Sequence, residues 1–285
     1  MTTHLLFLGT PEFSVPCLER IINHFPDFKI SVISMPDKVR GRGKSVSFSP
    51  VKQSAIDHNL PVYTPSSKSD LTHQINKLSP DLVVVVAYGM IIEKAIVDTY
   101  FCINVHASLL PKYRGASPIQ AALLNNDKTT GITLIKLNEF MDAGDMLAID
   151  ACPITDFDNF GSLETKLSQL GASLLTEFIK QQFLLQSFNI TPQNESDATY
   201  CKKISKDELI VDQSMSPHDI YLRIRAFSPK PGAIYFQGNQ RFKLLEATLV
   251  DRQLRLKKIQ PEGKPPMLYT DYLLGNPKGV DLDGH

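Results

Sequence analysis

The chain has few cysteines and no long apolar run, and both absences exclude whole classes of protein. Its four cysteines, Cys17, Cys102, Cys152 and Cys201, form no C-x-x-C pair. That spacing fits neither a zinc site nor a disulfide-stapled secreted module, so we expect buried thiols in a reducing cytoplasm. The longest apolar run, at 82–87, is far shorter than the ~20 residues of a membrane span. No basic region precedes the first apolar residues, so we expect neither a secretory signal nor membrane association.

The chain also has a net charge of zero and no phosphate-binding motif. Thirty Lys and Arg residues balance 30 Asp and Glu residues, which argues against a general nucleic-acid binder. Neither G-x-G-x-x-G nor a Walker motif occurs, so the sequence predicts no dinucleotide or nucleoside triphosphate site. Two regions are locally basic: 38–52 carries five basic residues and no acid, and 223–264 carries ten against three. Together they suit a polyanionic partner, although each alone is typical of a solvated surface.

The first half of the chain alternates apolar runs with helical patterns, which is typical of a parallel α/β sheet. Strands are expected at 5–8, 30–34, 82–87 and 103–106, and helices at 14–23, 51–58 and 70–78. A strand–loop–strand segment is expected over 131–154 with its loop at 138–145, and a long helix over 161–183.

A polar segment then separates this region from a smaller one. We predict a catalytic domain over 1–188, a linker over 189–205 and a small β-rich domain over 206–285. Within the last, a short helix is expected at 218–225 and strands at 233–236, 242–245 and 254–259.

The most informative stretch reads CINVHASLLPKYRGASPIQ over 102–120, followed by Asp142 in NEFMDAGDM. Because side chains alternate along a strand, Asn104 and His106 should point to one face. They stand at the carboxyl end of their strand, where ligands bind in open α/β sheets. Taken one at a time, His106 could be a buried core histidine, Asn104 a strand-end cap and Asp142 a turn residue before Gly144. Their shared context favours a catalytic role instead.

This stretch resembles the folate-dependent formyltransferases, in which an Asn-x-His pair precedes a Ser-Leu-Leu-Pro turn. The resemblance implies a Rossmann-like catalytic domain with a parallel sheet and a C-terminal OB-like domain. It makes Asn104 the donor to the oxyanion, His106 the base and Asp142 the group that supports His106. It also implies 10-formyltetrahydrofolate as formyl donor and no metal. The residues expected to contact the folate are Ser108, Leu109, Leu110, Pro111, Tyr88 and Gly89.

Three features favour the members of this family whose acceptor is the methionine carried by initiator tRNA. They are the basic segment at 36–52, the run at 115–120 and the basic stretch that begins at 223. The residues expected to contact tRNA are Arg42, Lys44, Arg40, Arg223 and Arg225. Only about 40 residues follow Leu245, too few for a complete five-stranded barrel, so a shortened one is expected. We expect a cytoplasmic monomer that acts in translation initiation.

Other readings remain open at this point. A sugar-nucleotide N-formyltransferase shares the trio and the turn, but it needs no basic loop. A glycinamide ribonucleotide formyltransferase is disfavoured because such enzymes are usually a single domain. A noncatalytic RNA-binding protein that kept the fold would have no need of Asn104, His106 and Asp142 together.

Overall fold

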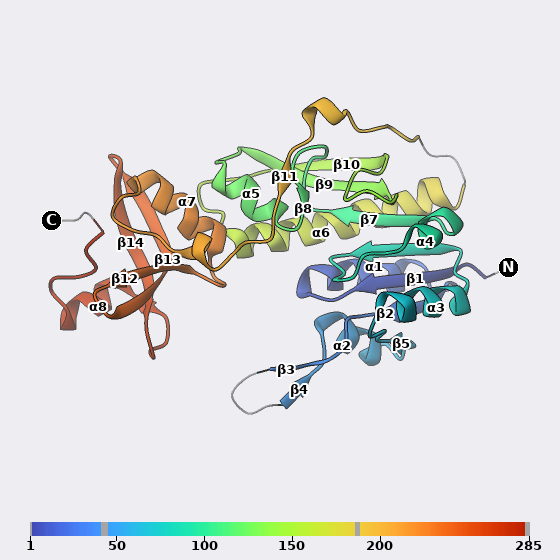
Figure 1. Cartoon of the computed structure of the whole chain (residues 1–285), viewed down its shortest axis with the longest axis horizontal. Coiled ribbons are helices and arrows are strands. Elements are labelled where there is room, and N and C mark those ends of the chain that lie inside the picture. Colours follow the sequence, from blue (N-terminus) through green and yellow to red (C-terminus); the bar gives the residue numbers. More distant parts are fainter. Residues whose placement is uncertain (1, 41–44, 186–188, 283–285) are drawn as a thin grey trace. The chain divides into compact units, whose positions relative to one another are not determined.

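The computed structural model describes residues 2–40, 45–185 and 189–282, and the chain divides into two compact units (Figure 1). Unit 1 comprises residues 1–114, 131–152 and 165–199. Unit 2 comprises residues 115–130, 153–164 and 200–285. Each unit is therefore assembled from segments that are far apart in the sequence.

Unit 1 is built on a seven-stranded sheet with the order β10-β9-β7-β6-β1-β2-β5. Its strands are β1 (His4–Gly9), β2 (Lys29–Ile33), β5 (Val62–Tyr63), β6 (Leu82–Val86), β7 (Cys102–His106), β9 (Thr129–Lys136) and β10 (Met146–Pro153). From β7 to β5 neighbouring strands run parallel, whereas β9 is antiparallel to β7. The strand order reverses between β1 and β6, and such switch points are where open α/β sheets bind ligands.

Helices cover the sheet of unit 1. They are α1 (Val15–His24), α2 (Pro50–Asp57), α3 (Lys68–Leu78), α4 (Lys94–Thr99) and α6 (Phe160–Phe178). The Ser49 side chain caps α2 by accepting from the Lys52 amide, and Pro50 begins the helix. Leu6 and Leu8 of β1 pack with Leu71 and Ile75 of α3 in one buried cluster.

The opposite face of the sheet receives α6. A Cβ atom on Gly171 of α6 would lie 3.0 Å from the Val105 side chain, so glycine lets the helix pack closely on β7. The parallel register pairs Val83 with Cys102 and Val85 with Asn104. Asn104 and His106 therefore lie on the face that carries the α3 cluster, and Val105 lies on the other, as the two-residue period of a strand requires.

Unit 2 contains a four-stranded antiparallel sheet in the order β12-β13-β14-β15. Its elements are α5 (Pro118–Leu124), α7 (Pro217–Phe227), β12 (Ala233–Gln237), β13 (Gln240–Val250), β14 (Gln253–Pro261), β15 (Met267–Leu268) and α8 (Tyr269–Gly275). In α7 the residues Ile220, Leu222, Ile224 and Phe227 are buried. Within the described part of the chain this sheet has four strands, which confirms the small β-rich C-terminal fold that the sequence predicts.

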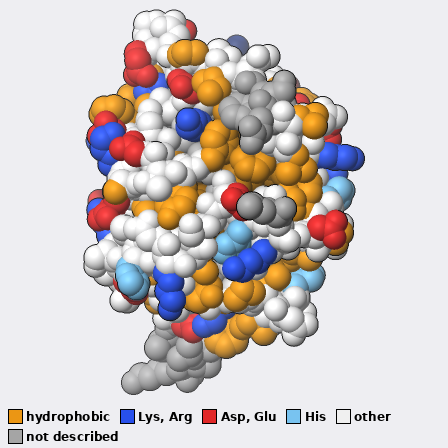
Figure 2. All heavy atoms as spheres, turned by 90° about the vertical axis from the view of Figure 1, so that its right-hand side faces the viewer, with side chains coloured by type: hydrophobic (Ala, Val, Ile, Leu, Met, Phe, Trp, Pro, Cys, Tyr) orange, Lys and Arg blue, Asp and Glu red, His pale blue; other side chains and the backbone are white. Residues whose placement is uncertain are grey.

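Several short elements lie outside the sequence predictions. They include α4, α5, α8, β5, β15, the paired strands β8 (Arg114–Gly115) and β11 (Tyr200–Cys201), and the paired strands β3 (Lys38–Arg40) and β4 (Ser45–Ser47). None of the described helices is both long and apolar enough to cross a membrane. On the face shown in Figure 2, charged side chains of both signs are scattered among hydrophobic ones.

Candidate active site

Strand β7 presents Asn104 and His106 at its carboxyl end. His106 is buried, with 5% of its surface exposed, and Asn104 is half-buried. Strand β7 pairs with β9 along 103–106 on one edge and with β6 as far as Asn104 on the other, so both side chains start from a backbone held in the sheet. The predicted common orientation of the pair is thus a property of the central sheet.

Asp142 reaches this pair from the loop between β9 and β10. Its Oδ1 accepts from Asn104 Nδ2 at 3.2 Å, and its Oδ2 lies 3.7 Å from His106 Nδ1. Asp142 has a left-handed backbone with φ of 50°, a conformation that costs free energy outside glycine and recurs at functional sites. The structure therefore brings together the three residues that the sequence predicts as the trio.

The loop that carries Asp142 is closed tightly at its base. The Lys136 amide donates to the Asp145 carbonyl at 2.9 Å. A Cβ atom on Gly144 would lie 1.8 Å from the Lys136 carbonyl oxygen, so only glycine fits there.

The hydrogen bond that His106 makes through Nε2 determines which ring nitrogen can accept a proton. His106 Nε2 lies 2.9 Å from the carbonyl oxygen of Tyr113, and a carbonyl can only accept, so Nε2 carries hydrogen. In the neutral ring Nδ1 then holds the lone pair, and it faces Asp142. A proton taken up at Nδ1 would sit beside a carboxylate, which stabilises the charged ring. Among the described residues the Asn104 amide donates to Asp142 alone, so its second hydrogen is left for another acceptor.

The Ser-Leu-Leu-Pro turn after β7 is held by internal hydrogen bonds. Ser108 is fully buried, and its hydroxyl donates to the Lys112 carbonyl at 2.6 Å. The buried Thr133 hydroxyl of β9 donates to the Ser108 carbonyl at 2.7 Å and accepts from the Leu110 amide at 3.1 Å. Leu110 is buried, whereas Leu109 and Pro111 are partly exposed. The turn that follows His106 is therefore fixed by hydrogen bonds from its own residues and from β9.

Tyr88 and Gly89 follow β6, the strand next to β7. Gly89 is exposed and lies against the Met35 side chain. Burial, and then the charge of Asp70, raise the pKa of Tyr88 to about 12, so its phenol stays protonated. Its buried Oη has no hydrogen-bond partner among the described residues, which leaves a polar atom able to meet a ligand.

Cys102 begins β7, but its thiol is not a nucleophile. Burial raises its pKa to about 12, against a smaller opposite effect of Lys136, and the reactive form of cysteine is the thiolate. The described residues contain no group of three or more His, Cys, Asp or Glu side chains placed to hold a metal ion.

A second group of residues at this site escaped sequence reasoning. Arg114 is fully buried, and its Nε donates to Gln193 Oε1 at 2.9 Å. Its two terminal nitrogens donate to the two carboxylate oxygens of Glu195 at 2.9 and 2.6 Å. Thr199 accepts from the Tyr113 amide at 2.9 Å through its hydroxyl. Residues 191–199 therefore pack against the site, although their polar composition is typical of a linker.

The residues expected to contact tRNA have mixed fates. Arg42 and Lys44 lie outside the described residues, and Arg40 is described only as the last residue of β3. Arg223 is partly exposed and donates to the Glu208 carbonyl. Arg225 is buried, and its guanidinium donates to the Asp158 and Thr155 carbonyls at 2.8 and 2.7 Å. Its charge therefore stabilises the fold of unit 2 and is not presented at the surface.

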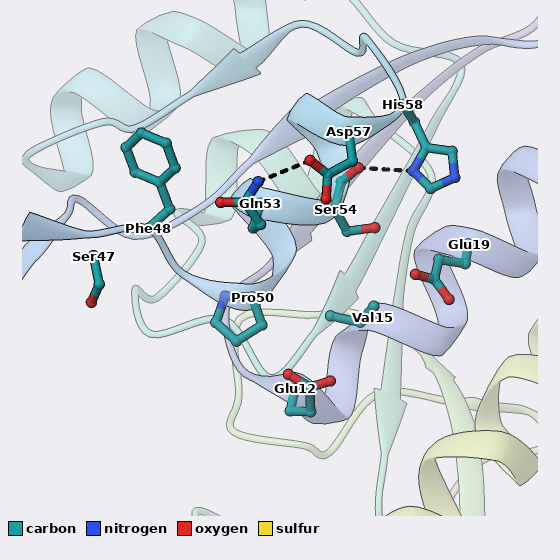
Figure 3. Close-up of a pocket in the computed structure, with 10 residues that line it drawn as sticks. All are labelled: Glu12, Val15, Glu19, Ser47, Phe48, Pro50, Gln53, Ser54, Asp57 and His58. Carbon is teal, nitrogen blue, oxygen red and sulfur yellow. Dashed lines mark hydrogen bonds between the residues drawn. The ribbon is translucent and has the colours of Figure 1, made fainter.

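A groove of about 580 Å³ lies between α1 and α2, apart from the predicted site residues. Figure 3 shows the carboxylates of Glu12, Glu19 and Asp57 around it, with the Gln53 amide donating to Asp57 at 2.9 Å. Three carboxylates disfavour an anionic ligand such as a phosphate. None of the residues predicted for catalysis or folate binding lines this groove.

Comparison with known proteins shows the family of this chain. The family model described as formyl transferase matches residues 5–179, and the model of the formyl transferase C-terminal domain matches residues 203–253. The methionyl-tRNA formyltransferase of Pseudoalteromonas translucida is 39% identical over 303 residues, which cover 95% of this chain and 93% of the relative. The chain belongs to the methionyl-tRNA formyltransferase family.

Solved structures share the fold of this methionyl-tRNA formyltransferase family member. The methionyl-tRNA formyltransferase from Clostridium thermocellum aligns with a TM-score of 0.63 at 16% identity, over 91% of this chain and 98% of that one. The N-formyltransferase from Helicobacter canadensis, in complex with folinic acid and dTDP-3-aminofucose, aligns with a TM-score of 0.66 at 22% identity, over 88% and 89%. At these identities the likeness is one of fold alone.

Proposed function

We propose that this protein transfers a formyl group from 10-formyltetrahydrofolate to the α-amine of methionine on initiator tRNA. The observation that carries the proposal is the convergence of Asn104, His106 and Asp142 in a chain of the methionyl-tRNA formyltransferase family. The product, formylmethionyl-tRNA, would serve translation initiation.

The three side chains have complementary tasks in such a transfer. The α-amine attacks the formyl carbon, and Asn104 donates its free hydrogen to the oxygen that becomes negative. His106 Nδ1 takes the proton released by the amine, while Asp142 stabilises the imidazolium. The same proton can pass from Nδ1 to the folate nitrogen as the old carbon–nitrogen bond breaks. The new amide forms without any net gain or loss of protons at the site.

The donor would lie along the carboxyl ends of β6 and β7. Leu109, Leu110 and Pro111 supply an apolar wall, and Ser108 supports that wall through its buried hydroxyl. The unpartnered Oη of Tyr88, next to the exposed Gly89, suits a polar group of the donor.

Basic residues of both units would hold the tRNA. We assign phosphate contacts to Arg40, Arg42 and Lys44 of the basic segment 36–52 and to the partly exposed Arg223. Lys52 is less suited, because it pairs with Asp37 at 2.6 Å. The catalytic domain over 1–188, the linker over 189–205 and the tRNA-binding domain over 206–285 stay predictions, as does a cytoplasmic monomer.

The acceptor is what separates this proposal from its nearest alternative, a sugar-nucleotide N-formyltransferase. The test supplies labelled 10-formyltetrahydrofolate together with methionine-charged initiator tRNA, uncharged tRNA, free methionine or an amino-sugar nucleotide. Label in the charged tRNA alone is the expected result. Label in the sugar would replace the proposal with the alternative, and tRNA binding without any transfer would indicate a noncatalytic RNA-binding protein.

A further inference from the structure

Residues 191–199 contact the two groups that face the nitrogens of the His106 ring, which are the Asp142 loop and Tyr113. On the Nδ1 side, the Gln193 amide nitrogen donates to the Asp142 carbonyl at 2.8 Å and to the Gly144 carbonyl at 2.7 Å. On the Nε2 side, Thr199 accepts from the amide of Tyr113, whose carbonyl faces the ring. One segment therefore holds two otherwise separate loops around the same imidazole.

The orientation of the Gln193 amide is determined by a buried cation. Arg114 Nε donates to Gln193 Oε1, so the amide nitrogen must face the loop, and both of its hydrogens go to carbonyl oxygens there. Arg114 is itself held by a bidentate pair with Glu195, a geometry that fixes direction as well as charge. Glu195, Arg114 and Gln193 thus form one chain of hydrogen bonds that ends on the backbone of Asp142.

This chain answers a structural need of the Asp142 loop. Asp142 has φ of 50°, and the neighbouring Phe140 and Met141 are 66% and 65% exposed, so burial of these side chains does little to hold the loop. Two hydrogen bonds from a fixed amide restrict the backbone instead. A small displacement there would move the carboxylate away from Nδ1, and misplacement by about 1 Å can reduce turnover by about 10²-fold.

We propose that Gln193 is a positioning residue for the formyl transfer, which acts by holding the Asp142 backbone so that its carboxylate faces His106 Nδ1. Arg114 and Glu195 orient the Gln193 amide for this task. The inference rests on the proposed function and adds to it a residue from the segment that sequence reasoning treats as a linker.

The variant that separates positioning from folding is Gln193→Glu. Its carboxylate keeps an acceptor for the buried Arg114, so the fold retains that contact, but it has no hydrogen to donate to the two loop carbonyls. Gln193→Met, of similar length and without polar atoms, is the second variant. Asn189→Ala is the matched control, because Asn189 is an exposed amide just outside the segment 191–199.

Both Gln193 variants should lower kcat by about 10- to 100-fold. The KM for the formyl donor and the KM for the charged tRNA should each change by less than about threefold. The loss should nearly vanish when Asp142→Asn is already present, because both changes remove the same function. Asn189→Ala should keep the wild-type kcat. Unchanged turnover in Gln193→Glu and Gln193→Met, or losses that multiply in the double variant, would overturn the inference.

Hydrogen exchange of the segment 138–146 gives a readout that needs no substrate. Exchange there should be faster in both Gln193 variants than in the wild type and in Asn189→Ala. Absence of formyl transfer by the wild-type protein, together with this change in exchange, would reject the proposed function and leave Gln193 as the residue that holds the loop. Unchanged exchange would reject the role of Gln193 whatever the substrate.

Discussion

Replacement of Asp142 by asparagine isolates the charge that faces His106. The carboxamide has nearly the shape of the carboxylate and can still accept from Asn104 Nδ2. It cannot stabilise a positive imidazole at 3.7 Å, and its own amide hydrogens can occupy the lone pair of Nδ1. Asp142→Asn therefore removes the favourable partner of the charged ring without creating a cavity.

The magnitude follows from the distance and from burial. Unit charges at this separation attract by about 4 kcal/mol at an effective dielectric of about 20. His106 and Asp142 expose 6% and 15% of their side chains, so screening by water is limited. Partial hydration of the separated charges reduces the lost attraction to about 3 kcal/mol, so kcat should fall by about two orders of magnitude.

The assay is steady-state formyl transfer to methionine-charged tRNA at saturating donor. The Tm of Asp142→Asn should stay within about 3 °C of the wild type, because no packing is lost. Asp145→Asn is the control, since Asp145 lies in the same loop and is exposed. A kcat of Asp142→Asn within about threefold of the wild type would refute the assignment of Asp142 as the support of His106.

Three further predictions address the turn, the basic segment 36–52 and the buried thiols. Thr133→Val leaves the Ser108 carbonyl and the Leu110 amide without a partner, so the free energy of unfolding in urea should fall by about 2 kcal/mol and the KM for the folate should rise; a change below about 0.5 kcal/mol would contradict this. Arg42→Ser with Lys44→Ser should weaken use of charged tRNA and flatten its salt dependence, whereas an unaffected KM for the tRNA would remove these residues from the interface. Burial raises the pKa of Cys17 and Cys102 from 9.0 to about 12, so the folded state retains protons that the unfolded state loses. The free energy of unfolding should therefore fall as pH rises from about 9 towards 12, less steeply in Cys102→Ala, and an equal slope in that variant would argue against a buried neutral thiol.

The parts of the fold that follow from local periodicity were predictable from the sequence. The apolar run at 82–87 became β6, and the two-residue spacing of Asn104 and His106 placed both on one face of β7. Helices α4 and α5 have six and seven residues, too few for a repeating apolar pattern, and sequence analysis missed them. The meeting of Asp142 with β7 was predicted only through the family resemblance, because nothing local in NEFMDAGDM points to His106.

Tertiary contacts explain what sequence reasoning could not see. Arg114 and Gln193 are 79 residues apart, and the polarity of 191–199 that indicates a linker also suits a segment that hydrogen-bonds to two loops. The count of basic residues likewise could not distinguish exposed charges from buried ones. Arg225 contributed to the basic balance of 223–264, yet its guanidinium is buried against backbone carbonyls. Periodicity predicts which face a side chain takes, but not which distant partner neutralises it.

The most direct test of the central claim is single-turnover transfer of labelled formyl from 10-formyltetrahydrofolate to methionine-charged initiator tRNA by the wild type and by His106→Ala. The wild type should form formylmethionyl-tRNA, and His106→Ala, folded and with unchanged tRNA binding, should be slower by about two orders of magnitude or more. No product from the wild type, or equal rates for the two proteins, would contradict the account.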